Sequence, residues 1–147
     1  MKKLGIILVC IATLAMSSCS LFQSAASSNS AAMTLGQTCG SAVLSLYRSY
    51  KATGSLSLAT GDNLTNALAL ATCYTQLSQN KDNSDYRKSF TNGLILSSAG
   101  LITNQNSNAF VNALLGTSTL GTLNSSSNTA QINKTTPAVT GLLQTLD

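Results

Sequence analysis

The feature that most constrains the fold of this chain is a helical periodicity, because apolar residues recur every three or four positions in one segment after another. The segments are separated by short stretches rich in glycine, asparagine and serine, which favour turns. This pattern predicts helices over 34–51, 64–77, 86–104 and 110–115, with a last helix from Pro137 onward. Short polar connections favour antiparallel neighbours, so we expect an all-α fold, a small antiparallel bundle of four or five helices.

The connections carry residues that end and begin helices. Gly54 ends the first segment, Gly61-Asp62-Asn63 supplies capping side chains for the second, and Gly116 closes the fourth. Thr136-Pro137 is expected to be the cap and the first helical residue of the last helix. The stretch 117–135 combines a glycine, a serine run and many β-branched residues, and it is compatible with a loop, a frayed helix or a short strand.

The first residues of the chain have the layout of an export signal. Lys2 and Lys3 precede an apolar run over 4–16, and small residues follow it. A helix over this run is about 20 Å long, whereas the apolar core of a bilayer is about 30 Å thick. A short apolar run between lysines and small residues therefore indicates a cleaved signal peptide rather than a membrane span. Its removal takes the formal net charge from +4 to +2, because two lysines leave with it.

The sequence Met16-Ser17-Ser18-Cys19 after this run resembles the end of a bacterial lipoprotein signal. In precursors of that family a diacylglyceryl group is joined to the cysteine and the chain is cut just before it, which implies that Cys19 is the lipid-bearing first residue of the mature protein. Ser20, in place of aspartate, implies onward sorting to the outer membrane. The alternative is ordinary cleavage after Ala15-Met16-Ser17, which leaves Cys19 as a free thiol.

These features divide the chain into three parts. Residues 1–18 are expected to be the signal peptide, residues 19–32 a lipid-anchored flexible tether, and residues 33–147 a single helical domain. The tether assignment depends on a composition rich in serine and alanine, without charge and without an apolar period. A flexible segment of this length spans roughly 20 Å, so the folded domain is expected to lie close to the membrane.

Two cysteines, Cys39 and Cys73, remain in the predicted helical domain. Export to an oxidising compartment permits a disulfide between them. If the first two helices form a hairpin, the two positions differ in height by only about 5 Å. Two separate buried thiols are the alternative, since cysteine is often buried unpaired. Zinc is not expected, because two cysteines without any histidine do not provide the usual set of ligands.

The residues that usually carry catalysis are scarce, since the chain has no histidine, no glutamate and four scattered aspartates. One motif, Ser78-Gln79-Asn80-Lys81, has the spacing of serine nucleophiles that are activated by lysine. It straddles the end of a predicted helix, and Lys134-Thr135-Thr136 lacks the glycine of the companion motif. We therefore do not expect this protein to be an enzyme, and we expect it to have no catalytic residue, no cofactor and no metal.

The basic residues are also dispersed along the sequence. Only Arg87-Lys88, and Arg48 with Lys51, lie close together, and neither pair forms a stripe. Nucleic-acid binding requires clustered lysine and arginine, so no nucleic-acid partner is expected. The sequence likewise contains no polybasic segment of the kind that assists adhesion to anionic membranes.

Small residues recur at helical spacing in two of the predicted helices. Gly36 and Gly40 form one such set, and Gly93, Ser97 and Gly100 form the other. Small residues on facing helices let the two backbones approach closely. We expect this contact to lie inside the bundle rather than between two copies of the chain, because helices in a bundle already pack on one another.

Two functions are compatible with these observations. The first is a membrane-tethered, non-enzymatic interaction or structural lipoprotein of the bacterial cell envelope, anchored in the outer membrane facing the periplasm and bound to an envelope protein partner. The second is a helical module that holds a lipid or another apolar ligand between its helices. The second is indicated by tyrosines placed around an aliphatic core, namely Tyr47, Tyr50, Tyr74 and Tyr86.

Overall fold

The computed structural model of this chain describes residues 25–59 and 61–147, and their side chains from Asn29 onward. Over these residues the chain forms five α-helices and one short 3-10 helix, without any strand. The elements are α3 (Ala25–Thr53), α4 (Gly61–Gln79), α5 (Ser84–Ser97), α6 (Ser107–Leu115), η1 (Ser118–Thr122) and α7 (Thr129–Gln144). The predicted all-α fold class is confirmed.

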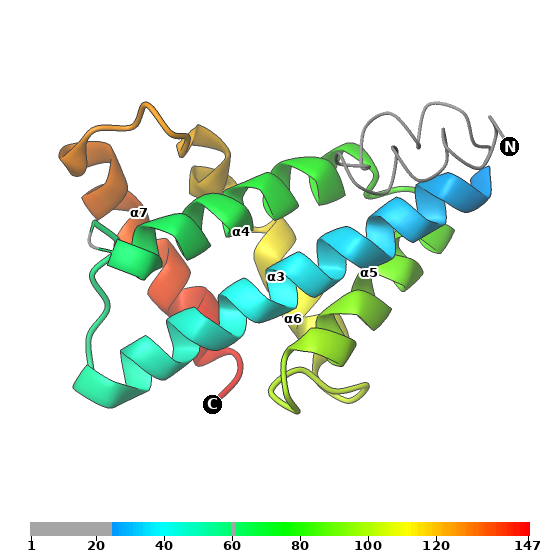
Figure 1. Cartoon of the computed structure of the whole chain (residues 1–147), viewed down its shortest axis with the longest axis horizontal. Coiled ribbons are helices and arrows are strands. Elements are labelled where there is room, and N and C mark those ends of the chain that lie inside the picture. The colour runs from blue at the N-terminus through cyan, green and yellow to red at the C-terminus, as the bar shows by residue number, and fades with distance from the viewer. Residues whose placement is uncertain (1–24, 60) are drawn as a thin grey trace, which may run out of the picture.

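The long helix α3 is the centre of the arrangement (Figure 1). Helix α4 runs back along it after a short loop, and α5 turns again, so that successive helices are antiparallel and α5 runs parallel to α3. Helix α6 packs on α4 and α5, whereas α7 and η1 close the end of the bundle near the C-terminus of α3. The short polar connections thus give the alternating directions that the sequence predicts.

One hydrophobic cluster extends through the described bundle. Every α-helix contributes to it, and its largest fully buried side chains include two phenylalanines, Phe90 of α5 and Phe110 of α6. The fully buried aliphatic side chains include Leu46, Leu58, Leu70, Leu77, Leu94, Ile102, Leu114, Leu120 and Leu143. Burial of one such side chain contributes about 1.5–3 kcal/mol, so this core is the main source of stability.

Helix α3 begins earlier than the sequence pattern indicates. The flexible tether predicted over 19–32 is wrong for its second half, because residues from Ala25 onward are helical and Ala32 is fully buried in the core. The composition gives a physical reason, since alanine has the highest helix propensity and serine is tolerated in a helix. Residues 19–24 of the tether and the predicted signal peptide, residues 1–18, lie outside the described residues.

Helix α5 ends at Ser97 rather than near Asn104. Ser98 is fully buried, and its Oγ accepts a hydrogen bond from the backbone N–H of Ile102 at 3.0 Å. This side-chain hydrogen bond closes a non-helical turn, so the helix does not continue. Ala99 and Gly100 within this turn both have positive φ, at 52° and 85°. Ile102 still reaches the core, but from the turn after the helix.

The undecided stretch 117–135 contains η1, a turn and the first part of α7. Asn128 caps α7: its side chain accepts from the N–H of Gln131 at 2.9 Å, while the side chain of Gln131 accepts from the N–H of Asn128 at 3.1 Å. The predicted start at Thr136-Pro137 is therefore wrong, and Pro137 lies inside the helix. The reciprocal cap at Asn128 provides acceptors for two backbone N–H groups, whereas Pro137 merely lacks a backbone N–H group of its own. The cap therefore sets the start of the helix.

Candidate functional site

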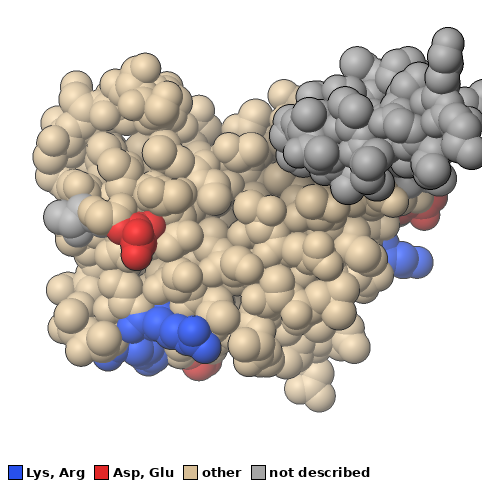
Figure 2. Space-filling model, in the orientation of Figure 1, with Lys and Arg blue, Asp and Glu red and all other residues tan. Residues whose placement is uncertain are grey.

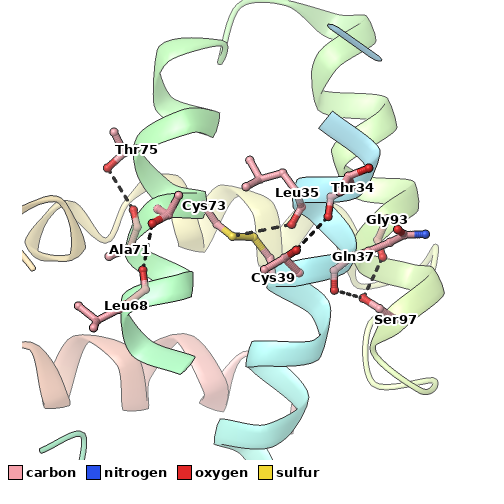
Figure 3. Close-up of a disulfide and its surroundings, with 12 residues drawn as sticks. Thr34, Leu35, Gln37, Cys39, Leu68, Ala71, Cys73, Thr75, Gly93 and Ser97 are labelled. Carbon is pink, nitrogen blue, oxygen red and sulfur yellow. Dashed lines mark hydrogen bonds between the residues drawn. A yellow bond between two sulfur atoms is a disulfide. The ribbon is translucent and has the colours of Figure 1, made fainter. Parts of the chain in front are cut away.

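The two cysteines of the described bundle form a disulfide that joins α3 to α4 (Figure 3). Cys39 and Cys73 are both fully buried, and their Cα atoms are 6.2 Å apart. The sulfur of Cys73 also lies 3.9 Å from the carbonyl oxygen of Leu35, a contact rather than a hydrogen bond, because a disulfide sulfur has no proton to donate. Of the two alternatives that the sequence leaves open, the structure contains the bridge.

Helices α3 and α5 touch through their backbones at a seam of small residues. A side chain added at Gly36 would overlap the carbonyl group of Phe90, and one added at Gly40 would lie 2.8 Å from the carbonyl oxygen of Leu94. An added Cβ at Gly93 would lie 2.9 Å from the Cα atom of Gly36. The small residues at these three positions therefore serve packing inside the bundle, as expected.

Ser97 completes this seam with a polar contact. Its Oγ lies 2.6 Å from the carbonyl oxygen of Gln37 on α3 and 3.1 Å from that of Gly93 on its own helix (Figure 3). Gly100, the third member of the predicted set, does not belong to the seam, because it lies in the turn after α5 and a Cβ added there would meet nothing within 4 Å. Its positive φ explains the glycine instead.

The C-terminal residue is held against the end of α3 by a polar cluster. Lys51 Nζ and Tyr47 Oη each donate a hydrogen bond to Asp147 Oδ1, both at 2.8 Å. The Lys51 ammonium also lies 5.5 Å from the centre of the Tyr47 ring and 5.8 Å from that of Tyr50. Gln144 Nε2 lies 3.4 Å from Tyr50 Oη. Two of the four predicted ligand-site tyrosines thus have structural partners.

The charges of this cluster shift one another. The hydrogen bonds from Lys51 and then from Tyr47 hold the pKa of the Asp147 carboxyl below its ordinary value. The hydrogen bond to Asp147 raises the pKa of Tyr47 and that of Lys51. The three side chains therefore favour one protonation state at neutral pH: a charged lysine and carboxylate beside a neutral phenol.

The other two tyrosines lie elsewhere in the fold. Tyr86 of α5 is 6% exposed, and burial raises its pKa. Tyr74 of α4 is half-buried and lies under η1, where its ring would be 3.2 Å from a side chain added at Gly121. The fold therefore does not gather the four tyrosines into one site.

The Ser78-to-Lys81 motif falls at the end of α4. Ser78 is in the last turn of the helix, and Lys81 is exposed in the turn that follows it. A lysine that activates a serine needs a desolvated environment, which this position does not provide. The aspartates near this turn, Asp82 and Asp85, are exposed as well.

Two surface depressions of the described bundle are lined by polar side chains. One, of about 580 Å³, lies between α3 and the start of α4 and includes Arg48, Asp62 and Asn63. Asn63 does not cap α4 as predicted, because its Nδ2 donates to Ser49 Oγ and to the carbonyl oxygen of Ser57, both at 3.0 Å. This amide fixes the α3–α4 loop instead.

The other depression, of about 620 Å³, lies where the α4–α5 turn meets α5 and α6. Three basic side chains line it, Lys81, Arg87 and Lys88, although the first is well separated from the others in sequence. We call it the basic depression. Its remaining lining residues are Asp82, Ser84, Thr91, Asn92, Asn104, Asn108 and Val111.

Two further observations concern the described residues alone. No group of three or more histidine, cysteine, aspartate or glutamate side chains in residues 25–59 and 61–147 is placed to hold a metal ion. None of the described helices combines the length and apolarity needed to cross a bilayer. The predicted lipidation site, Cys19, lies outside these residues.

Comparison with models of protein families, with curated proteins and with solved structures finds no match to this chain.

Proposed function

We propose that this chain is a non-enzymatic lipoprotein of the bacterial cell envelope, tethered through a lipid on Cys19 and acting by contact with another envelope component. The observation that carries the proposal is the leader: two lysines, a short apolar run, and small residues that end at a cysteine. This cysteine is six positions before Ala25, where α3 begins. A folded module thus follows the proposed anchor closely.

The buried disulfide supports export. Disulfides persist in oxidising compartments such as the periplasm and are rare in the cytosol. The bridge between Cys39 and Cys73 closes a sequence separation of 34 residues, and it ties the two longest described helices together. A periplasmic location, with the anchor in the outer membrane, is the compartment that fits both the leader and this bridge.

A role in contact rather than catalysis is supported by the use of the polar side chains. Lys51, Asp147 and Tyr47 hold the C-terminus, Ser97 joins α3 to α5, and Asn63 fixes a loop. Outside these structural contacts, the described surface offers mainly hydroxyls and amides, with few charges apart from those of the basic depression. Such a surface suits recognition of a protein neighbour.

The anchor is tested by growing cells with labelled palmitate. The unmodified chain is expected to incorporate label and to yield a mature form that begins at residue 19. Cys19→Ser should abolish the label, whereas Cys10→Ser should retain it, because Cys10 lies in the part that is removed. An unlabelled product, or an amino terminus at another residue, would refute the anchor.

The contact function is tested by photo-crosslinking in intact cells. Leu96 is the natural site for the photoreactive residue, because it is 65% exposed and is the large apolar side chain that the described bundle leaves in solvent. The photoreactive residue introduced in place of Lys134, on α7, serves as the control. We expect one recurrent protein neighbour from the first position. A failure to capture any recurrent protein, together with a higher melting temperature in fatty acid, would favour the apolar-ligand alternative instead.

A further inference from the structure

The fold gathers half of the cations of the mature chain at one place. From residue 19 onward the chain contains six lysines and arginines, and Lys81, Arg87 and Lys88 all line the basic depression. Lys81 and Lys88 are exposed and Arg87 is half-buried, with its Nη2 3.4 Å from Asn112 Oδ1. On the face drawn in Figure 2, charged side chains lie toward the two ends and the middle is uncharged.

The basic depression lies at the end of the bundle where α3 begins. Gly36 faces Phe90 and Gly40 faces Leu94, so residue numbers rise together along α3 and α5, and the two helices are parallel. The first turn of α5 therefore lies level with the second and third turns of α3, toward the end of the bundle where α3 begins in Figure 1. Arg87 and Lys88 lie where this first turn of α5 ends.

Covalent geometry keeps this end close to the proposed anchor. Six residue steps separate Cys19 from Ala25, and a fully extended chain of that length spans at most about 22 Å, whatever its conformation. The lipid on Cys19 would therefore hold the start of α3 within that distance of the headgroups, and it would hold Arg87, which is level with Met33, about 12 Å farther along α3. At such distances a tether gives a high effective concentration, so even weak attraction orients the module.

The lining has the chemistry of a phosphate-binding surface. Three cations attract phosphate charge, and the hydroxyl of Ser84 and the side-chain amides of Asn92 and Asn108 add hydrogen-bond donors. The hydroxyl of Thr91 does not, because it donates to the carbonyl oxygen of Arg87 at 2.7 Å. Asp82 opposes this attraction, because its carboxylate lines the same depression. We propose that the basic depression is the face with which the anchored module docks on anionic phospholipid headgroups, which turns the opposite end, with the C-terminus of α3, away from the membrane. This inference depends on the proposed lipid anchor.

Vesicle binding without the lipid tests the docking face by itself. The chain from residue 19 onward with Cys19→Ser contains the whole described bundle and has no anchor. It is mixed with vesicles of phosphatidylcholine alone or of phosphatidylcholine with phosphatidylglycerol, and the bound fraction is measured by sedimentation. We expect binding to the anionic vesicles only, and we expect it to weaken as salt is added.

Two triple variants separate the basic depression from net charge. Changing Lys81, Arg87 and Lys88 to glutamine is expected to lower the partition coefficient by about a hundredfold, since each cation near an anionic surface contributes roughly fivefold and the three contributions multiply. The matched control changes the other three cations to glutamine, which removes the same charge and should have a much smaller effect. Those three are Arg48, Lys51 and Lys134. Circular dichroism verifies that both variants are folded.

A fourth variant acts in the opposite direction. Asp82→Asn removes the opposing carboxylate from the depression and is expected to strengthen binding to anionic vesicles several-fold. Equal binding to both kinds of vesicle, equal weakening in the two triple variants, or no binding at all would overturn the docking face. These results do not involve Cys19, so palmitate on Cys19 together with no vesicle binding would refute the docking face alone.

Discussion

The same substitution, glycine to alanine, is expected to have opposite effects in two helices of this bundle. At Gly141, in α7, an added Cβ meets nothing within 4 Å. Gly141→Ala should therefore raise the free energy of unfolding by about 0.5–1 kcal/mol, because alanine has the higher helix propensity. At Gly93 the Cβ would lie 2.8 Å from the backbone nitrogen of Gln37 and would also overlap the carbonyl oxygen of Met33. Backbone atoms cannot rotate away, so α3 and α5 must separate.

The magnitude at Gly93 follows from three contributions. Overpacking costs about 1–3 kcal/mol. Separation of the helices also stretches the 2.6 Å contact between Ser97 Oγ and the carbonyl oxygen of Gln37, which costs about 1 kcal/mol. Helix propensity returns about 1 kcal/mol. Gly93→Ala is therefore expected to destabilise by about 1–3 kcal/mol, a decrease in melting temperature of roughly 4 °C per kcal/mol.

Urea unfolding of the oxidised protein, followed by helical circular dichroism, measures both variants. The expected result is a lower midpoint for Gly93→Ala and a higher midpoint for Gly141→Ala. If Gly93→Ala instead raised the midpoint as Gly141→Ala does, the two backbones would not meet at this seam. The parallel register of α3 and α5, and the position derived for the basic depression, would then be wrong as well.

Three other predictions concern the disulfide and the polar contacts of Ser97 and Asp147. Reduction of the Cys39–Cys73 disulfide should lower stability by about 3–4 kcal/mol, seen as a lower urea midpoint with reductant, and a Cys39→Ala/Cys73→Ala variant should no longer respond to reductant. Ser97→Ala should cost about 1 kcal/mol, and an unchanged midpoint would contradict the contact with α3. The folded state lowers the pKa of Asp147, so its contribution to stability is complete above the pKa of 3.8 in the unfolded chain and is lost as pH falls through the pKa in the folded chain. Asp147→Asn should therefore flatten this acid limb in pH-dependent melting.

Much of the fold could be predicted from local patterns. The helical period predicts a segment that overlaps each of the five described α-helices, and Gly116 ends α6 as expected. The errors are at helix ends. A Ser/Ala-rich segment without an apolar period is predicted as a tether, yet the helix begins at Ala25. Helix ends depend on caps and turns such as those of Ser98 and Asn128, where one or two side-chain hydrogen bonds decide between similar backbone conformations.

The candidate sites were harder to predict from the sequence than the helices. The separation between Lys81 and the Arg87-Lys88 pair hides the basic depression, because the α4–α5 turn and the start of α6 bring its lining together only in the folded chain. The spacing of the cysteines made their disulfide a reasonable alternative, but the orientation of the two side chains could not be inferred from it. Asp147 and Tyr47 are 100 residues apart, and no local pattern links them.

The sequence by itself determined that this chain is helical and approximately where its helices lie, and it predicts a leader that resembles a lipoprotein signal. These properties are local, because the period of apolar residues and the order of charged, apolar and small residues are read along a single stretch of chain. Tertiary structure alone decided which helices touch, that Cys39 and Cys73 meet, and that three cations share one depression at the end where α3 begins. Such contacts depend on how helix faces pack against one another, and many packings are compatible with the same local periodicity.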